Sequence, residues 1–202
     1  MGDLLDLLDM ENQKVIRTFV AVCLDMELRN GISAIQDRVK QLAPAVKWVA
    51  PENFHVTLKF LGGIDADRVA CAQSALDEVA SKFAAFDMSI SGLGVFPNSR
   101  RPRVVWVGIE DGREQLTALA GAVETRLAEA GFSKEDKPFK SHITIGRVSE
   151  IRPVGDLAER MASVNADNIG SQRVDSIVVM KSVLRPDGPV YTALSVHKLS
   201  NI

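Results

Sequence analysis

The chain carries one short pattern, histidine, any residue, threonine, inside two separate apolar segments. The first segment reads FHVTLKFLG and holds His55 and Thr57, and the second reads KSHITIGRV and holds His142 and Thr144. Because alternate side chains of a β-strand point to the same face, each histidine should project together with its threonine, away from a buried apolar face. Two imidazoles and two hydroxyls that converge on a small ligand can bind an anion and transfer protons on both sides of it.

Such a set suits an in-line displacement at phosphorus. One histidine takes a proton from the attacking water while the other gives a proton to the leaving oxygen, and an unperturbed imidazole pKa of ~6.5 lets both states coexist at neutral pH. The threonine hydroxyls can donate hydrogen bonds to the non-bridging phosphate oxygens. A zinc site would need a third ligand at a recognisable spacing, which the sequence lacks. We therefore expect no metal and no cofactor, and the third histidine, His197, is interpreted as an ordinary strand residue.

Apolar periodicity predicts the elements that position these residues. In the first half, strands are expected at 15–24, around 46–63 and at 88–96, with amphipathic helices at 26–42 and 65–83. In the second half, the same reasoning predicts strands at 102–110, 139–148, 176–184 and 191–199, and helices at 112–130 and 155–164.

The two halves follow the same order. His142 lies 87 positions after His55, and Arg103 lies 86 positions after Arg17 on the opening strand. This spacing indicates an internal duplication. We expect a single domain over 15–202 made of two repeated halves, whose lobes bring the two motifs together across a cleft. The acidic, leucine-rich residues 1–14 are expected to be a flexible N-terminal extension.

Composition limits the function classes. The 202 residues are 46% apolar and 25% charged, as in ordinary globular proteins. No stretch is long and apolar enough to cross a bilayer, and the acidic start is unlike a signal peptide, so a cytoplasmic protein without membrane contact is expected. Cys23 and Cys71 sit in apolar segments without metal-binding spacing and are interpreted as small buried residues.

The net charge of −2 provides no overall positive field for nucleic acid. Contact with RNA would have to come from local basic groups. One candidate is the NSRRPR run, which contains Arg100, Arg101 and Arg103, and a second comprises Lys134, Lys137, Lys140 and Arg147.

These motifs resemble those of the 2H phosphoesterase superfamily, and within it the RNA 2′,3′-cyclic phosphodiesterases, also called LigT-type 2′-5′ RNA ligases. The similarity runs over about residues 15–199 and includes RTFVAV, VKWVAPENFHVTLKFLG, GLGVFPNSRRPRVVWVGI, FKSHITIGRV and RPDGPVYTALSVHKL. It implies an α/β (α+β) bilobal fold with two pseudo-symmetric lobes, each with an antiparallel sheet and helices. The family's partner is an RNA with a 2′,3′-cyclic phosphate end or a cyclic nucleotide, and we expect a monomer.

The resemblance also implies roles for residues. The enzyme would open a 2′,3′-cyclic phosphate to a 2′-phosphate without a metal, with His55 as the acid that protonates the 3′ oxygen, His142 as the base, and Thr57 and Thr144 as phosphate anchors. Arg147 matches a position that contacts substrate in similar proteins. Strict alternation would turn Arg147 away from the cleft, so either a bulge at Gly146 re-aims it or the strand ends there.

Two further features leave alternatives open. Phe19 on the first strand could stack on a base if its face borders the cleft, or it could pack in the core. Ser141 stands where family members commonly have proline, which changes none of the reacting groups.

The alternative functions are a phosphodiesterase for a small cyclic nucleotide, such as ADP-ribose 1″,2″-cyclic phosphate, and a non-catalytic protein that binds RNA ends.

Overall fold

The computed structural model describes residues 15–43, 46–148 and 157–200. The predicted N-terminal extension, 1–14, lies outside these residues. The elements, in chain order, are β1 Ile16–Cys23, α2 Met26–Lys40, β2 Val46–Trp48, the 3₁₀ turn η1 Pro51–Asn53, β3 His55–Ile64, α3 Ala66–Lys82, β4 Phe86–Phe96, β5 Val104–Ile109, α4 Arg113–Glu129, β6 His142–Val148, α5 Leu157–Met161, β7 Gly170–Val174, β8 Ser176–Arg185 and β9 Gly188–Lys198.

The long helices begin where the sequence supplies a cap and an apolar stripe. Asp25 accepts a hydrogen bond from the Leu28 amide at the start of α2, and Asp65 accepts one from the Arg68 amide at the start of α3, both over 2.8 Å. The stripe of α2 consists of Leu28, Ile32, Ile35 and Val39, which are buried against the sheet.

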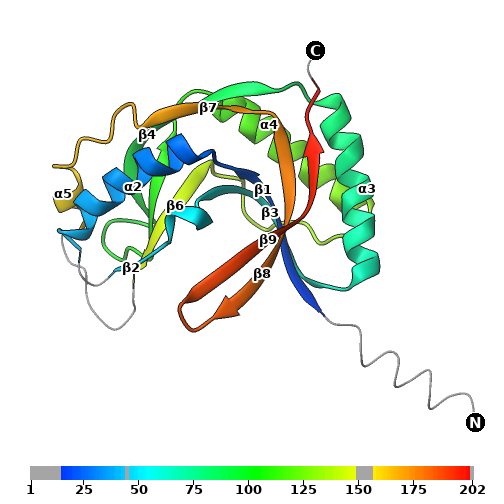
Figure 1. The fold of residues 1–202 in the computed structure, drawn as a ribbon, viewed down its shortest axis with the longest axis horizontal. Coiled ribbons are helices and arrows are strands. Elements are labelled where there is room, and N and C mark those ends of the chain that lie inside the picture. The colour runs from blue at the N-terminus through cyan, green and yellow to red at the C-terminus, as the bar shows by residue number, and fades with distance from the viewer. Residues whose placement is uncertain (1–14, 44–45, 149–156, 201–202) are drawn as a thin grey trace, which may run out of the picture.

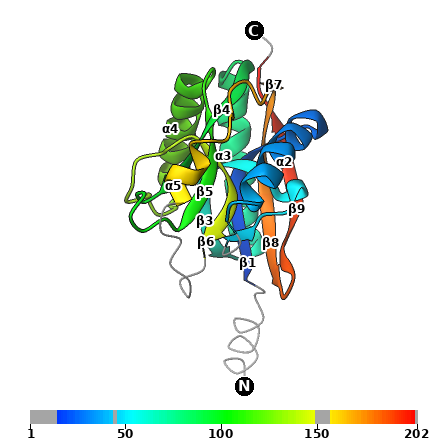
Figure 2. The ribbon, with the colours of Figure 1, turned by 90° about the vertical axis from the view of Figure 1, so that its left-hand side faces the viewer.

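All strands join one curled antiparallel sheet in the order β7-β4-β5-β6-β3-β1-β8-β9, and β2 adds to β6 (Figure 1). We call β3, β1, β8 and β9 the β3 lobe, and β6, β5, β4, β7 and β2 the β6 lobe. The α3 and α4 helices pack on the β3 lobe, whereas α2 and α5 pack on the β6 lobe. The β8–β9 hairpin projects beyond the helices in both views (Figures 1 and 2). The two lobes meet where β3 and β6 pair.

The lobes exchange strands between the two halves of the sequence. The β4 strand, from the first half, pairs with β5 of the second, and β8, from the second half, pairs with β1 of the first. The predicted duplication therefore gives two lobes that each contain strands from both halves. A repeat in sequence does not reveal this exchange, because lobes with exchanged strands and lobes without them bury the same apolar faces.

Three local features differ from the predicted elements. The expected strand around 46–63 is interrupted, because Pro51 begins the turn η1 between β2 and β3. The short polar strand β7 was not predicted. The predicted helix at 155–164 is the five-residue α5, and positions 155 and 156 lie outside the described residues.

Candidate active site

The four motif residues meet where β3 contacts β6. The two strands share one residue pair, Val56 with Ile143, and both side chains are fully buried. Residues on either side of a paired position point to the opposite face. The antiparallel direction therefore places His55 beside Thr144 and Thr57 beside His142 on the other, half-buried face of the sheet, which we call the cleft face.

A β-bulge follows the threonine in each motif. Opposite β1, Val20 pairs with Lys59 and Ala21 with Thr57, which leaves Leu58 unpaired. Ile145 is left unpaired opposite β5 in the same way. The unpaired residues are again 87 positions apart, so the duplication has reproduced the bulge together with the histidines.

The bulges turn the side chain of the fifth residue after each histidine toward the cleft. These side chains are Phe60, which is 61% exposed, and Arg147. Arg147 thus shares a face with His142, as predicted from a bulge, although the bulged residue is Ile145 and not Gly146, and β6 continues to Val148.

The residue that follows the bulged residue differs between the two motifs: it is Lys59 in the first and Gly146 in the second. Lys59 is buried, and its Nζ donates to Glu124 Oε2 over 2.6 Å and to the Ser133 carbonyl over 2.7 Å. At the equivalent Gly146, an added Cβ would lie 2.6 Å from Val46 Cγ1. Glycine is therefore needed there for β2 to approach β6.

Both histidines are oriented by the carbonyl two residues before them. His55 Nδ1 lies 2.8 Å from the Asn53 oxygen, and His142 Nδ1 lies 2.7 Å from the Lys140 oxygen. A carbonyl oxygen only accepts, so Nδ1 carries the proton in each ring. The Nε2 atom is then the one available to a ligand, as an acceptor in the neutral ring and a donor in the imidazolium.

Aromatic side chains support the His55 ring. Phe19 lies 4.9 Å from it and Tyr191 lies 5.3 Å from it, edge-on. Phe19 is only 4% exposed and also contacts Tyr191, with ring centroids 5.0 Å apart. Its position behind the imidazole fits the core-packing alternative better than stacking on a base, for which Phe60 is the more open ring.

The His142 ring has a similar support on the β6 lobe. Phe96 packs edge-on against it at 5.0 Å and also lies 5.0 Å from Trp106. Lys140 Nζ lies over the Phe96 ring, 5.3 Å from its centre. Each imidazole is thus fixed by one hydrogen bond and by packed aromatic rings.

Burial lowers the pKa of both histidines below the ordinary value, and nearby cations lower it further. Arg147 contributes at both rings and also acts on Tyr191. Lys140 adds to the effect on His142, whereas His142 and Arg29 add to the effect on His55. Both rings are consequently biased toward the neutral form before an anion binds.

The remaining candidates lie around or away from this site. Cys23 pairs with His55 across β1 and β3, and both cysteines are half-buried free thiols, more open than predicted. His197 is buried elsewhere, between Asp77 Oδ1 at 2.6 Å and Ser195 Oγ at 2.8 Å. This row of hydrogen bonds joins Asp77 on α3 to Ser195 on β9, and we interpret it as structural because His197 is buried away from both motifs.

In the part of the chain that the structure describes, no helix is long and apolar enough to span a membrane. The same residues contain no group of three or more His, Cys, Asp or Glu side chains that could hold a metal ion.

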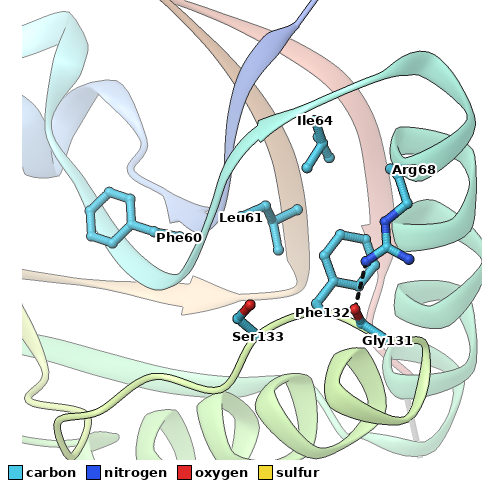
Figure 3. A pocket seen from close by; sticks show the side chains of 7 residues that line it. All are labelled: Phe60, Leu61, Ile64, Arg68, Gly131, Phe132 and Ser133. Atoms are coloured by element: carbon cyan, nitrogen blue, oxygen red, sulfur yellow. Dashed lines mark hydrogen bonds between the residues drawn. The ribbon is translucent and has the colours of Figure 1, made fainter.

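A separate cavity of about 170 Å³ lies between the end of β3, the start of α3 and the end of α4 (Figure 3). Arg68 donates there to the carbonyls of Ala130 and Gly131 and lies 3.9 Å over the Phe132 ring. Its guanidinium is therefore already engaged by the protein. Phe60, which also lies on the cleft face, is at its edge, but none of the lining residues is a motif histidine or threonine, so we assign the chemistry to the cleft face.

Comparison with known proteins identifies the family. A family model described as LigT-like phosphoesterase matches the chain twice, at residues 23–106 and 107–191. The chain belongs to the LigT-like phosphoesterase family. It is 37% identical to the RNA 2′,3′-cyclic phosphodiesterase of Methanothermobacter thermautotrophicus, over 91% of this chain and 99% of the relative, and 38% identical to that of Archaeoglobus fulgidus, over 91% and 100%.

Solved structures of known proteins agree with the fold of this chain. A Thermus thermophilus protein superposes with a TM-score of 0.76 at 30% identity, covering 91% of this chain and 97% of that one. E. coli LigT in complex with 3′-AMP gives 0.73 at 27% identity, covering 92% and 99%. The predicted family and fold class are confirmed. The predicted enzyme class, a phosphoric diester hydrolase, agrees with the two relatives named RNA 2′,3′-cyclic phosphodiesterase.

Sequence reasoning missed several neighbours of the motifs. Tyr191, Asn53 and Phe96 all contact a histidine or its support, yet only their presence in family-like segments could have drawn attention to them. Phe60 had a usable signal, because it follows His55 by the same five positions that separate Arg147 from His142.

Proposed function

We propose that this protein hydrolyses the 2′,3′-cyclic phosphate at an RNA end, or of a nucleotide, to a 2′-phosphate, without a metal ion and in the cytoplasm. The observation that carries the proposal is the pairing of β3 with β6, which puts two imidazoles, each with Nδ1 bonded to a carbonyl, on one face of the sheet with two threonines. The curated relatives that carry the name RNA 2′,3′-cyclic phosphodiesterase add support.

In the proposed reaction, water attacks phosphorus while the bond from phosphorus to O3′ breaks. His142 Nε2 takes the proton of the water, and the His55 imidazolium gives its Nε2 proton to O3′. The oxygen from water remains on the 2′-phosphate, so atoms and protons balance. In 2′-5′ RNA ligation the 5′-hydroxyl of a second RNA would take the place of water: His142 takes the hydroxyl proton, the hydroxyl oxygen bonds to phosphorus, and the bond from phosphorus to O3′ breaks as His55 protonates O3′.

The lowered pKa of each histidine fits this division of roles only once an anion is bound. The neutral form that burial and Arg147 favour is the one required of the base. The acid must be protonated, and a phosphate beside His55 would stabilise its imidazolium by direct attraction and by offsetting the Arg147 charge. Thr57, Thr144 and Arg147 would hold the non-bridging oxygens, where charge is retained in the transition state.

The first test is hydrolysis of 2′,3′-cyclic AMP and of a short RNA with a cyclic end, in excess EDTA, with the product isomer identified by chromatography. We expect the 2′-phosphate, and a loss of about 10²–10⁴-fold in His55→Ala and in His142→Ala. The double variant should lose far less than the product of the two factors, because the pair acts as a unit. Undiminished turnover by His142→Ala would overturn the proposal.

A substrate with a good leaving group separates the two roles. Bis(4-nitrophenyl) phosphate releases nitrophenolate, which needs no proton. His55→Ala should therefore lose much less activity on this diester than on cyclic AMP, whereas His142→Ala should lose similar factors on both. The opposite pattern would exchange the acid and the base.

The same assays decide between the alternatives. Turnover of ADP-ribose 1″,2″-cyclic phosphate well above that of RNA would identify a small-molecule phosphodiesterase. Binding of RNA ends without turnover of any cyclic phosphate would indicate the non-catalytic protein.

A further inference from the structure

The loop between β4 and β5, residues 97–103, is held by its own hydrogen bonds and presents two exposed arginines. Asn98 Oδ1 accepts from the amides of Arg100 and Arg101, over 3.1 and 3.0 Å, and the Arg103 amide donates to the Phe96 carbonyl. Pro102 is buried and anchors the loop, whereas Arg100 and Arg101 are exposed.

This loop begins next to a row of side chains that lies on the cleft face. Phe96 pairs with Val104, and Val104 pairs with Arg147, so the three side chains form one row on the cleft face. The loop begins directly beyond that row. His142 pairs with Gly108 and Arg147 with Val104, four residues further along β5, which separates their backbones by roughly 14 Å at a rise of about 3.4 Å per residue. A ligand held at the motifs must extend past Arg147 to reach the loop.

Four cations at this end of the cleft face have no carboxylate partner in the part of the chain that the structure describes. Elsewhere, basic side chains form ion pairs, such as Lys59 with Glu124, Arg126 with Glu78 and Lys198 with Asp175. Among the residues that the structure describes, no carboxylate lies within ion-pair distance of Arg100, Arg101, Lys140 or Arg147. In a chain with a net charge of −2, this is a local site for a polyanion.

We propose that the 97–103 loop binds the phosphodiester backbone of the substrate RNA, a few nucleotides 5′ of the terminal cyclic phosphate, through Arg100 and Arg101. The RNA runs from the two histidines past Arg147 to the loop, so the loop adds affinity for RNA and none for a mononucleotide. This inference rests on the proposed function for the position of the RNA end. Contacts to the backbone alone predict little dependence on base sequence.

The test is direct binding, which requires no turnover. A fluorescent eight-nucleotide RNA that ends in a 2′-phosphate is titrated by anisotropy at several salt concentrations. Arg100→Ala/Arg101→Ala should bind it about 5- to 20-fold more weakly. The slope of log affinity against log salt should fall by about 0.7 for each lost phosphate contact. Hydrolysis of 2′,3′-cyclic AMP should be unchanged.

The control variant is Lys82→Ala/Arg185→Ala, which removes two exposed cations at the end of α3 and at the tip of the β8–β9 hairpin. It should bind the RNA nearly as the unaltered protein does. The inference is wrong if the loop variant keeps its RNA affinity and salt slope, or if the control loses as much. If the unaltered protein hydrolyses neither substrate, the proposed function fails, while the binding comparison still decides the role of the loop.

Discussion

Asn53 offers the sharpest test of how the site is held. Its carbonyl accepts the Nδ1 proton of His55 over 2.8 Å, and its side-chain amide donates to the Pro189 carbonyl over 2.9 Å. Pro189 lies on β9 two residues before Tyr191, whose ring packs edge-on against His55. One residue therefore joins the imidazole to the hairpin strand that supports it.

Asn53→Ala keeps the backbone carbonyl and removes only the side-chain bond. A net hydrogen bond is worth about 0.5–1.5 kcal/mol. If that energy orients His55, kcat should fall by up to about 10-fold, since about 1.4 kcal/mol corresponds to a factor of ten. The same loss lowers Tm by roughly 2–4 °C for each kcal/mol in a chain of this size. Because the acid is misplaced rather than the phosphate anchors, KM should change less than kcat.

The matched control is Asn165→Ala, which removes a side-chain acceptor of the Asp167 amide at 2.9 Å, away from the cleft. Its Tm is compared directly with that of Asn53→Ala. Hydrolysis of 2′,3′-cyclic AMP and thermal unfolding are measured on both variants, and Asn53→Gln tests whether a longer amide restores the rate. If Asn53→Ala loses Tm but keeps its kcat, Asn53 is only structural and the argument fails.

Further perturbations test the electrostatics and the packing. Arg147→Gln removes a cation that opposes protonation, so the pKa of both His55 and His142 should rise and the profile of kcat/KM against pH should move to higher pH; an unmoved profile would contradict this. Gly146→Val should lower stability by about 1–3 kcal/mol in urea unfolding, because its side chain overlaps β2, and should weaken hydrolysis. Lys59→Met should cost less stability than Lys59→Ala, since methionine fills the buried volume; equal losses would show that the charge dominates.

Local patterns predicted most of the elements that form the site. The apolar stripe marks α2 and the apolar run marks β1, because each signal acts over a few residues. The β7 strand has no such signal: GSQRV is polar and contains glycine, and it becomes a strand by pairing with β4. Tertiary pairing decided its structure, which sequence periodicity cannot indicate.

The site shows the same division between local and distant information. The motif predicted which side chains of β3 and β6 share a face, because alternation is a local rule. Tyr191 and Phe96 reach the histidines from strands far away in the chain, and no spacing rule connects them. The bulges also escape alternation, since one unpaired residue reverses the face of every later side chain.

The duplicated bulge gives the cleft two unlike rims. A site of two identical histidine–threonine pairs would accept a cyclic phosphate in either of two orientations related by the two-fold axis. The fifth residue after each histidine breaks this symmetry, because Phe60 presents an exposed ring on the β3 lobe and Arg147 presents a cation on the β6 lobe. A nucleoside favours the apolar rim and a phosphate the cationic one. We therefore expect this difference to determine which histidine faces the leaving oxygen, although the two histidines themselves occupy equivalent positions.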